Sequence, residues 1–224
     1  MLCEALKNSG LAGRPEEYFW RDDERFWKER WQVSSYADYL AGAIAQGTTP
    51  NGVFGAKIMW GYFEDFVNKL RAIPGYEELS VADLLSTVFP NLHYISITRL
   101  DKVRQAVSFE KAIQTNIWVT TEETAPFMGK LRFDFARIDA LVHVIESHEA
   151  AWQHYFAENG IIPFTVIYEE LVAAYEQTSV RVLHELNVPV PESLQFTPRR
   201  LKQQADALSE EWIQRYYAMK GSAT

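Results

Sequence analysis

The sequence predicts an α/β fold, in which a parallel β-sheet carries helices on both faces. Short β-branched and aromatic runs, which are typical of buried strands, alternate with longer segments of helical periodicity. Strands and helices that alternate in this way are joined by right-handed crossovers, which place helices over the sheet. The chain has 224 residues, 47% of them hydrophobic, so it can bury one substantial core and residues 1–224 are expected to form a single domain.

The first part of the chain is predicted to be mainly helical, with one strand. Gly10 and the Pro74-Gly75 pair are helix-ending signals. The expected elements are a helix at 2–9, a loop at 11–20, one or two amphipathic helices at 22–40, a buried strand at 51–59 and helices at 61–73 and 81–87.

The rest of the chain contains two further strands. The first follows the turn signal Phe89-Pro90-Asn91, and Asn159-Gly160 ends the longest helix. The expected elements are a strand at 92–98, a helix at 102–118, a polar loop at 120–130, a helix at 133–159, a strand at 162–168, a helix at 171–186, a linker at 188–191 and a helix at 210–220.

Arg99 follows the strand predicted at 92–98, and Ser108 lies in the next helix, for which Asp101 is a suitable cap. In open parallel sheets ligands collect at the carboxyl ends of strands, beside helix amino termini whose free N–H groups favour anions. A guanidinium group there would make charge-assisted hydrogen bonds to phosphate. The arrangement predicts half of a phosphate-binding site. The alternative from spacing alone is a surface arginine and a helix-facing serine.

Four sequence blocks, in one order and spanning nearly the whole chain, resemble a known family. They are LAGRPEEYF at 11–19, TPNGVFGAKIMW at 49–60, TRLDKVRQAVSFEKAIQT at 98–115 and SEEWIQRY at 209–216. These blocks resemble the bacterial trehalose 2-sulfotransferase family of carbohydrate sulfotransferases. The resemblance implies a P-loop-like three-layer sandwich with a parallel sheet. It also implies an enzyme that moves a sulfuryl group from 3'-phosphoadenosine 5'-phosphosulfate to a carbohydrate hydroxyl, of trehalose or another glycan or glycolipid, without a metal.

The resemblance assigns donor-binding roles at two places. Arg99 and Ser108 match the residues that bind the 3'-phosphate of the nucleotide in the family. Gln204 and Ser209 match the carboxyl-terminal stretch that folds back towards the nucleotide, although Gln203 stands where relatives commonly carry arginine. The alternative for this stretch is an amphipathic helix that only packs on the core.

The resemblance also implies a general base and an acceptor site. The base is expected at Glu17, where a carboxylate partly dried by aromatic neighbours would accept the proton of the attacking sugar hydroxyl. Without the resemblance, two adjacent carboxylates in a loop would be taken as solvated. The residues implied to line the disaccharide site are Arg14, Pro15, Glu16, Glu17, Tyr18, Phe19 and Trp20.

Lys57 is expected to be the second catalytic residue. A lysine in an apolar run must lie at an exposed end or be paired with an anion, because an unpaired buried charge is costly. Family relatives place a lysine near the sulfuryl group, where it offsets charge on the bridging oxygen, and the resemblance gives Lys57 this role. The competing interpretation is a salt bridge to Asp65 or another carboxylate.

The family opens with a strand and a Gln-Arg-Ser-Gly-Ser-Thr loop that cradles the 5'-phosphosulfate, and neither occurs in this sequence, whose first residues match the following helix. The expectation is therefore a chain that lacks the first central strand, is poorly soluble and transfers no sulfate. An alternative function is that of a catalytically silent relative that binds a sugar or a partner protein. A third alternative, a relative of the P-loop kinases, would fit the architecture. This sequence has no Walker lysine, however.

Composition and net charge limit the classes of partner that are expected. A net charge of −8 argues against nucleic acid or an anionic membrane surface as the main partner. The single cysteine, Cys3, excludes an internal disulfide and fits a cytoplasmic location. No apolar run approaches the ~18 residues of a membrane span, and the five histidines are too scattered to predict a metal site. The oligomeric state is left open, a homodimer included.

Overall fold

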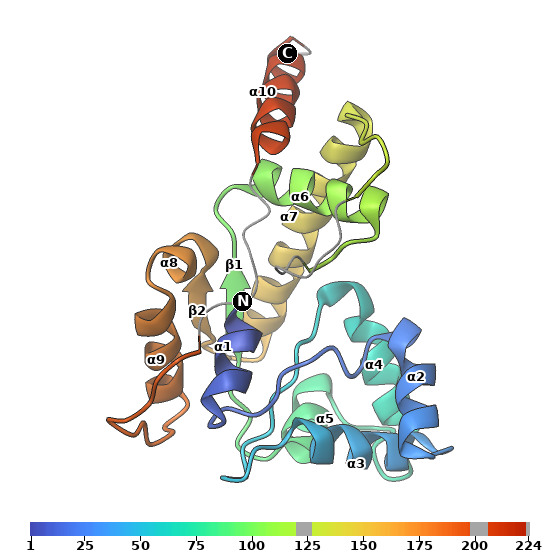
Figure 1. Cartoon of the computed structure of the whole chain (residues 1–224). Helices are drawn as coiled ribbons and strands as arrows, with labels where there is room; N and C mark the ends of the chain where they lie inside the picture. The colour runs from blue at the N-terminus through green and yellow to red at the C-terminus, as the bar shows by residue number, and fades with distance from the viewer. Residues whose placement is uncertain (120–126, 198–205, 223–224) are drawn as a thin grey trace.

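The computed structural model of the chain describes residues 1–119, 127–197 and 206–222. Helices dominate these ranges and surround one short parallel sheet (Figure 1). The elements are α1 (Leu2–Ser9), α2 (Arg21–Trp31), α3 (Tyr36–Gly47), α4 (Trp60–Arg71), α5 (Val81–Val88), β1 (Ile95–Thr98), α6 (Lys102–Thr115), α7 (Phe135–Glu158), β2 (Phe164–Ile167), α8 (Tyr168–Ala173), α9 (Tyr175–Glu185) and α10 (Ala207–Gly221).

The two strands of the sheet lie inside the ranges predicted at 92–98 and 162–168. They pair in parallel, with Ile95 opposite Phe164 and Thr98 opposite Ile167. The α6 and α7 helices form the crossover between them, as a parallel pair requires. The α/β class with a parallel strand pair is thus confirmed.

The prediction of a strand at 51–59 is wrong. Only Phe54 forms a bridge in this segment, and it pairs with Thr48 in antiparallel fashion. The backbone amides of Gly55 and Lys57 instead donate to the carbonyls of Gly47 and Glu16, so the segment is extended against a loop. In the described residues the sheet therefore has two strands, and a sheet covered on both faces is not seen: Ile97 of β1 remains 50% exposed. The P-loop-like three-layer sandwich stays a prediction.

Helix boundaries follow local capping signals. The Asp101 side chain accepts a hydrogen bond from the backbone N–H of Arg104, which confirms it as the cap of α6. Gln32, in the left-handed region at φ 56°, ends α2, and Ser35 caps α3, so the predicted helical region at 22–40 is two helices. The predicted helix at 171–186 is likewise divided into α8 and α9 at Ala174.

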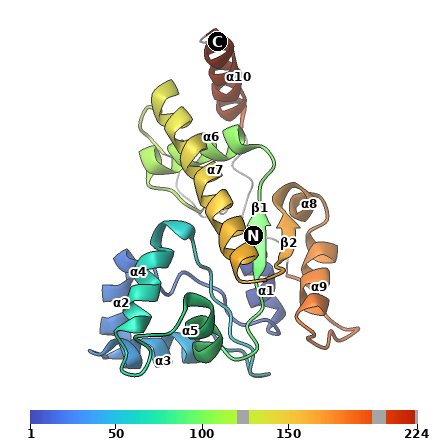
Figure 2. The ribbon, with the colours of Figure 1, turned by 180° about the vertical axis from the view of Figure 1, so that it is seen from behind.

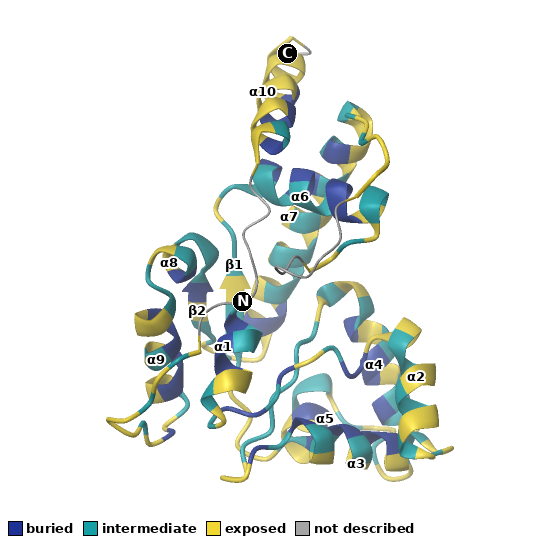
Figure 3. Cartoon of the chain, in the orientation of Figure 1, coloured by how far each residue is buried: buried dark blue, intermediate teal, exposed yellow. Residues whose placement is uncertain are grey.

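The long helix α7 connects two separately packed cores. Its first half packs with α6 and α10 around Ile138, Val142 and Trp212. Its last turns pack with α3, α4 and α5 in the larger aromatic core, through Tyr155 and Phe156. Figure 2 shows α7 running from one part to the other, and Figure 3 shows that buried residues occur in both parts, for example on α6 and α5. A third core joins α1, α8 and α9 to β2.

Candidate active site

The loop at 11–17, which carries the first four of the expected acceptor residues, is fixed against the segment at 47–57. The backbone N–H of Arg14 donates to the carbonyl of Gly47 at 2.7 Å, and that of Lys57 donates to the carbonyl of Glu16 at 2.9 Å. The amide of Gly13 donates to the hydroxyl of Thr49 at 3.1 Å. These hydrogen bonds place Lys57 beside Glu17.

The contact between the two segments needs glycine. A Cβ atom added at Gly13 would lie 2.2 Å from the amide nitrogen of Gly55, and Gly13 also has φ +74°. A side chain at Gly47 would meet the ring of Phe54 at 2.5 Å. Because backbone approaches backbone here without intervening side chains, the loop position is tightly defined.

Glu17 and Lys57 form an ion pair at this junction. Lys57 Nζ lies 2.5 Å from Glu17 Oε1, and both side chains are only partly buried, so solvent or a ligand can reach them. The Tyr62 hydroxyl, from the first turn of α4, donates to the carbonyl of Lys57 at 3.0 Å and lies 3.4 Å from Glu17 Oε2. Burial, and then the Glu17 carboxylate, raise the pKa of Tyr62 well above its usual range, so its hydroxyl keeps its proton.

The pairing of Lys57 answers the question left by the sequence. Asp65, the named competitor, pairs instead with Lys69 at 2.7 Å, and the carboxylate beside Lys57 is Glu17. Cys3 on α1 lies close enough to Lys57 to feel its charge, although burial is the larger effect and raises the pKa of the thiol.

The other residues expected to line the acceptor site have different surroundings. Tyr18 and Phe19 are 1% and 3% exposed and pack in the aromatic core, so their side chains support the loop. Pro15 is buried as well. Glu16 pairs with Lys7 at 2.5 Å, and Trp20 is 38% exposed at the start of α2.

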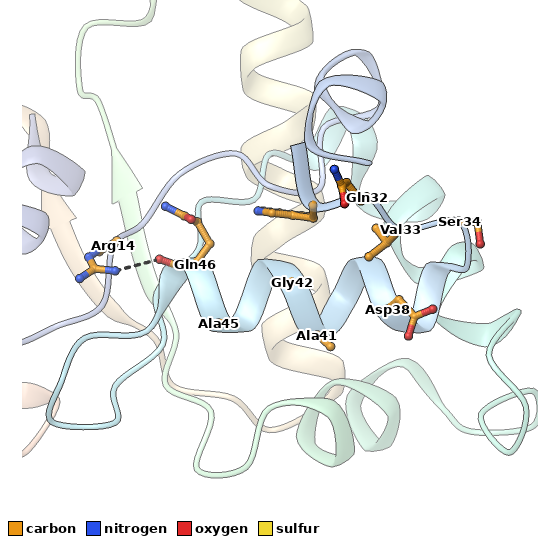
Figure 4. Close-up of a pocket in the computed structure, with 10 residues that line it drawn as sticks. Arg14, Gln32, Val33, Ser34, Asp38, Ala41, Gly42, Ala45 and Gln46 are labelled. Carbon is orange, nitrogen blue, oxygen red and sulfur yellow. Dashed lines mark hydrogen bonds between the residues drawn. The ribbon is translucent and has the colours of Figure 1, made fainter. Parts of the chain in front are cut away.

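Arg14 lies at the end of an open groove of about 730 Å³ along α3. Its guanidinium donates to the carbonyl of Gln46 at 3.4 Å, while Ser34 and Asp38 lie at the opposite end (Figure 4). The groove offers guanidinium, amide, hydroxyl and carboxylate groups, together with the ring of Trp31.

Arg99 lies directly after β1, as predicted. Its guanidinium carbon lies 4.2 Å from the ring centre of Tyr168, the first residue after β2. Arg99 Nε is buried and has no hydrogen-bond partner within the described ranges. The guanidinium is therefore oriented by an aromatic ring and remains available to an anion.

The remaining donor-binding candidates lie along α6 and α10. Ser108 is half-buried on α6, seven residues after the cap Asp101. The Ser209 hydroxyl accepts a hydrogen bond from Lys111 Nζ at 2.9 Å, and Lys111 also pairs with Asp206 at 2.8 Å. Gln204 lies outside the described residues.

Three residues beside these sites were missed by sequence reasoning. Tyr62 contacts the ion pair, Tyr168 stacks on Arg99, and Glu169 accepts hydrogen bonds from the backbone after Arg99. The position of Tyr168 at the end of the strand predicted at 162–168 was a usable signal, since neighbouring parallel strands end at the same edge of a sheet.

The described residues give no indication of a metal centre or a membrane span. They contain no group of three or more His, Cys, Asp or Glu side chains able to hold a metal ion. No helix among them is both long and apolar enough to cross a bilayer.

Comparison with known proteins identifies the family of the chain. The family model described as Stf0 sulphotransferase matches residues 1–219. The trehalose 2-sulfotransferase of Mycolicibacterium smegmatis is 28% identical over 249 residues, which cover 96% of this chain and 89% of the relative. That of Mycobacterium tuberculosis is 26% identical over 251 residues, covering 97% of this chain and 90% of the relative. The chain belongs to the Stf0 sulphotransferase family and is an enzyme of the sulfotransferase class.

Proposed function

We propose that the protein transfers a sulfuryl group from 3'-phosphoadenosine 5'-phosphosulfate to a carbohydrate hydroxyl. The observation that carries this proposal is the Glu17–Lys57 ion pair, because it joins a proton acceptor and a cation at one partly open point of the molecule. The donor would supply the sulfuryl group and leave as adenosine 3',5'-bisphosphate. Family membership supports the class of reaction, and the names of the two relatives support a sugar acceptor.

Glu17 and Lys57 would divide the chemistry between them. The Glu17 carboxylate would accept the proton of the sugar hydroxyl as its oxygen bonds to sulfur. Lys57 Nζ would offset the negative charge that grows on the bridging oxygen as its bond to sulfur breaks. Their 2.5 Å contact fixes their relative position.

Arg99 and Ser108 would hold the 3'-phosphate of the donor. The stacking on Tyr168 supports the assignment, as does the buried Nε of Arg99, which has no partner among the described residues. A guanidinium that no carboxylate of this part of the chain pairs with can take an external anion. Gln204 and Ser209 complete the proposed donor contacts. Ser209 is already bonded to Lys111, so its hydroxyl would be shared between the protein and the ligand.

Arg14, Glu16 and Trp20 would bind the acceptor next to Glu17. The groove that begins at Arg14 gives a disaccharide or larger glycan room to extend along α3. Tyr18, Phe19 and Pro15 would act indirectly, by fixing the loop on the core.

We further propose that residues 1–224 belong to one domain and that its complete fold is a P-loop-like three-layer sandwich. Parallel sheets are normally covered on both faces, whereas Ile97 is half exposed. A further strand or helix over this face would complete the sheet.

The test is transfer of labelled sulfate to trehalose and a panel of other sugars, together with calorimetry of adenosine 3',5'-bisphosphate binding. Sulfated sugar would support this function against the expectation from the sequence that residues 1–224 transfer no sulfate. Nucleotide binding should weaken by roughly 1.5–3 kcal/mol in Arg99→Ala. Arg181→Ala is the matched control, because it also removes an arginine that lies over an aromatic ring, that of Phe164.

The function would be wrong if wild-type protein sulfates none of the sugars while binding one of them tightly, which would favour a silent sugar-binding relative. The donor site would be wrong if Arg99→Ala and Arg181→Ala bind the nucleotide equally well.

A further inference from the structure

Glu169 connects the loop after β1 to the start of α8. Its two carboxylate oxygens accept hydrogen bonds from the backbone N–H groups of Leu100, at 3.1 Å, and Asp101, at 3.5 Å. These amides belong to the turn between Arg99 and the first residue of α6. A single side chain therefore fixes the backbone that directly follows Arg99.

The register of the sheet explains this contact. Thr98 lies opposite Ile167, and the next residues along the two chains are Arg99 and Tyr168, whose side chains stack. One position further, Glu169 reaches the amides that follow Arg99. Two consecutive residues of α8 thus orient the side chain and the backbone of the same loop.

The Glu169 carboxylate accepts hydrogen bonds from backbone amides, and no ion pair joins it to Arg99 among the described residues. Among the described residues Arg99 makes no ion pair, and its Nε has no hydrogen-bond partner. The arrangement keeps the guanidinium fixed and still positively charged, which is what recognition of an external anion requires.

We propose that Glu169 is a positioning residue for the donor nucleotide. It holds residues 99–101 so that Arg99 and the amino end of α6 converge on the same phosphate group. This inference rests on the donor site proposed above and adds to it a residue that would contact no ligand itself.

Positioning and simple electrostatics predict opposite results when the carboxylate is removed. If Glu169 acted only through its charge, removing this negative charge from the neighbourhood of an anion site would strengthen anion binding. If Glu169 positions the loop, deleting it weakens binding, because Arg99 loses its fixed orientation. The sign of the change therefore separates the two effects.

The experiment compares Glu169→Ala, Glu169→Gln and Glu170→Ala in the otherwise unchanged chain. Glu170 is the next residue, is exposed and has the same charge, so its variant measures the electrostatic effect alone. Calorimetry with adenosine 3',5'-bisphosphate and with adenosine 5'-phosphate measures how much the 3'-phosphate adds to affinity.

We expect Glu169→Ala to bind the bisphosphate about tenfold more weakly, a change of ~1.4 kcal/mol, and to bind the 5'-phosphate unchanged. Glu169→Gln should recover part of the loss, because its amide oxygen still accepts a hydrogen bond. Glu170→Ala should bind like wild type or slightly more tightly. Equal or tighter bisphosphate binding by Glu169→Ala would overturn the proposal.

Hydrogen exchange of the ligand-free protein tests the positioning directly. The amides of Leu100 and Asp101 should exchange about tenfold faster in Glu169→Ala than in Glu170→Ala, since they lose their acceptor. Unchanged exchange would reject the role of Glu169 whether or not the nucleotide binds. If instead exchange rises but wild type does not distinguish the two nucleotides, the donor site has failed and Glu169 only stabilises a loop.

Discussion

Lys57 Nζ lies 2.5 Å from Glu17 Oε1, although the two residues are 40 positions apart in the chain. The contact is set by the backbone hydrogen bond from Lys57 to the carbonyl of Glu16, and it leaves both side chains partly open to solvent. A pair with this geometry can supply a base and a cation to the same reaction.

Replacing Glu17 by Gln should abolish most of the turnover. Gln keeps the size of the side chain but cannot accept a proton, so we expect kcat to fall by about 10²–10⁴-fold. Binding of adenosine 3',5'-bisphosphate, measured by calorimetry, should not change. Glu29→Gln, which removes an exposed carboxylate from α2, serves as the control. Unaltered kcat in Glu17→Gln would exclude Glu17 as the base.

Replacing Lys57 by Met should lower kcat by about 10²–10³-fold, the usual cost of removing a group that stabilises transition-state charge.

Tyr62→Phe should have a smaller effect on kcat, because the Tyr62 hydroxyl lies closer to the backbone carbonyl of Lys57 than to the carboxylate of Glu17. We expect it to destabilise the fold by roughly 0.5–1.5 kcal/mol in urea unfolding. A larger loss of kcat in Tyr62→Phe than in Lys57→Met would reverse the assigned roles.

The glycine contact beneath the loop can be tested with a matched pair of variants. Gly10 and Gly13 both have positive φ, but a Cβ at Gly10 meets nothing within 4 Å, whereas one at Gly13 meets the Gly55 backbone. Gly10→Ala should cost about 1–2 kcal/mol from backbone strain alone. Gly13→Ala should cost more and should also reduce turnover, because it displaces Glu17. Equal melting temperatures for the two variants would contradict this packing.

The junction of α6 and α10 should weaken in acid. Burial alone would raise the pKa of Asp206, but hydrogen bonds from Lys111 and Ser209 outweigh it and lower the pKa. A lowered folded-state pKa means that the stabilisation is complete above the unfolded value of ~3.9 and is lost as pH falls through the folded value.

This prediction is checked by comparing wild type with Asp206→Asn in urea unfolding from pH 7 to pH 3. The difference in unfolding free energy should be constant down to about pH 4 and should then shrink, since a protonated Asp resembles Asn. A difference that grows on acidification would show that Asp206 is not stabilising as a carboxylate.

Local signals in the sequence were enough for several helix ends and for the two paired strands. Asp101 was identified as a cap from its residue type and position, and its side chain does bond to the amide of Arg104. Capping depends on a few neighbouring residues, so a single sequence contains the necessary information.

The sequence was insufficient to predict features that depend on contacts between residues far apart in the chain. The extended segment at 51–59 has the composition of a strand, but its partner is the loop at 11–17 and not a sheet, which only tertiary contacts decide. The same limit applies to Tyr18 and Phe19, whose burial in the core the sequence did not indicate. Aromatic character alone does not tell a binding surface from a core.

The two cores that α7 connects separate the parts of the proposed reaction. The loop with Glu17 is supported by the aromatic core at one end of α7, and α6, which follows Arg99, belongs to the core at the other end. Substitutions that reshape the first core can leave the second unchanged. Evolution could therefore exchange the acceptor side of such an enzyme while retaining one nucleotide-binding side, and a designer could join the two sides from different relatives at this helix.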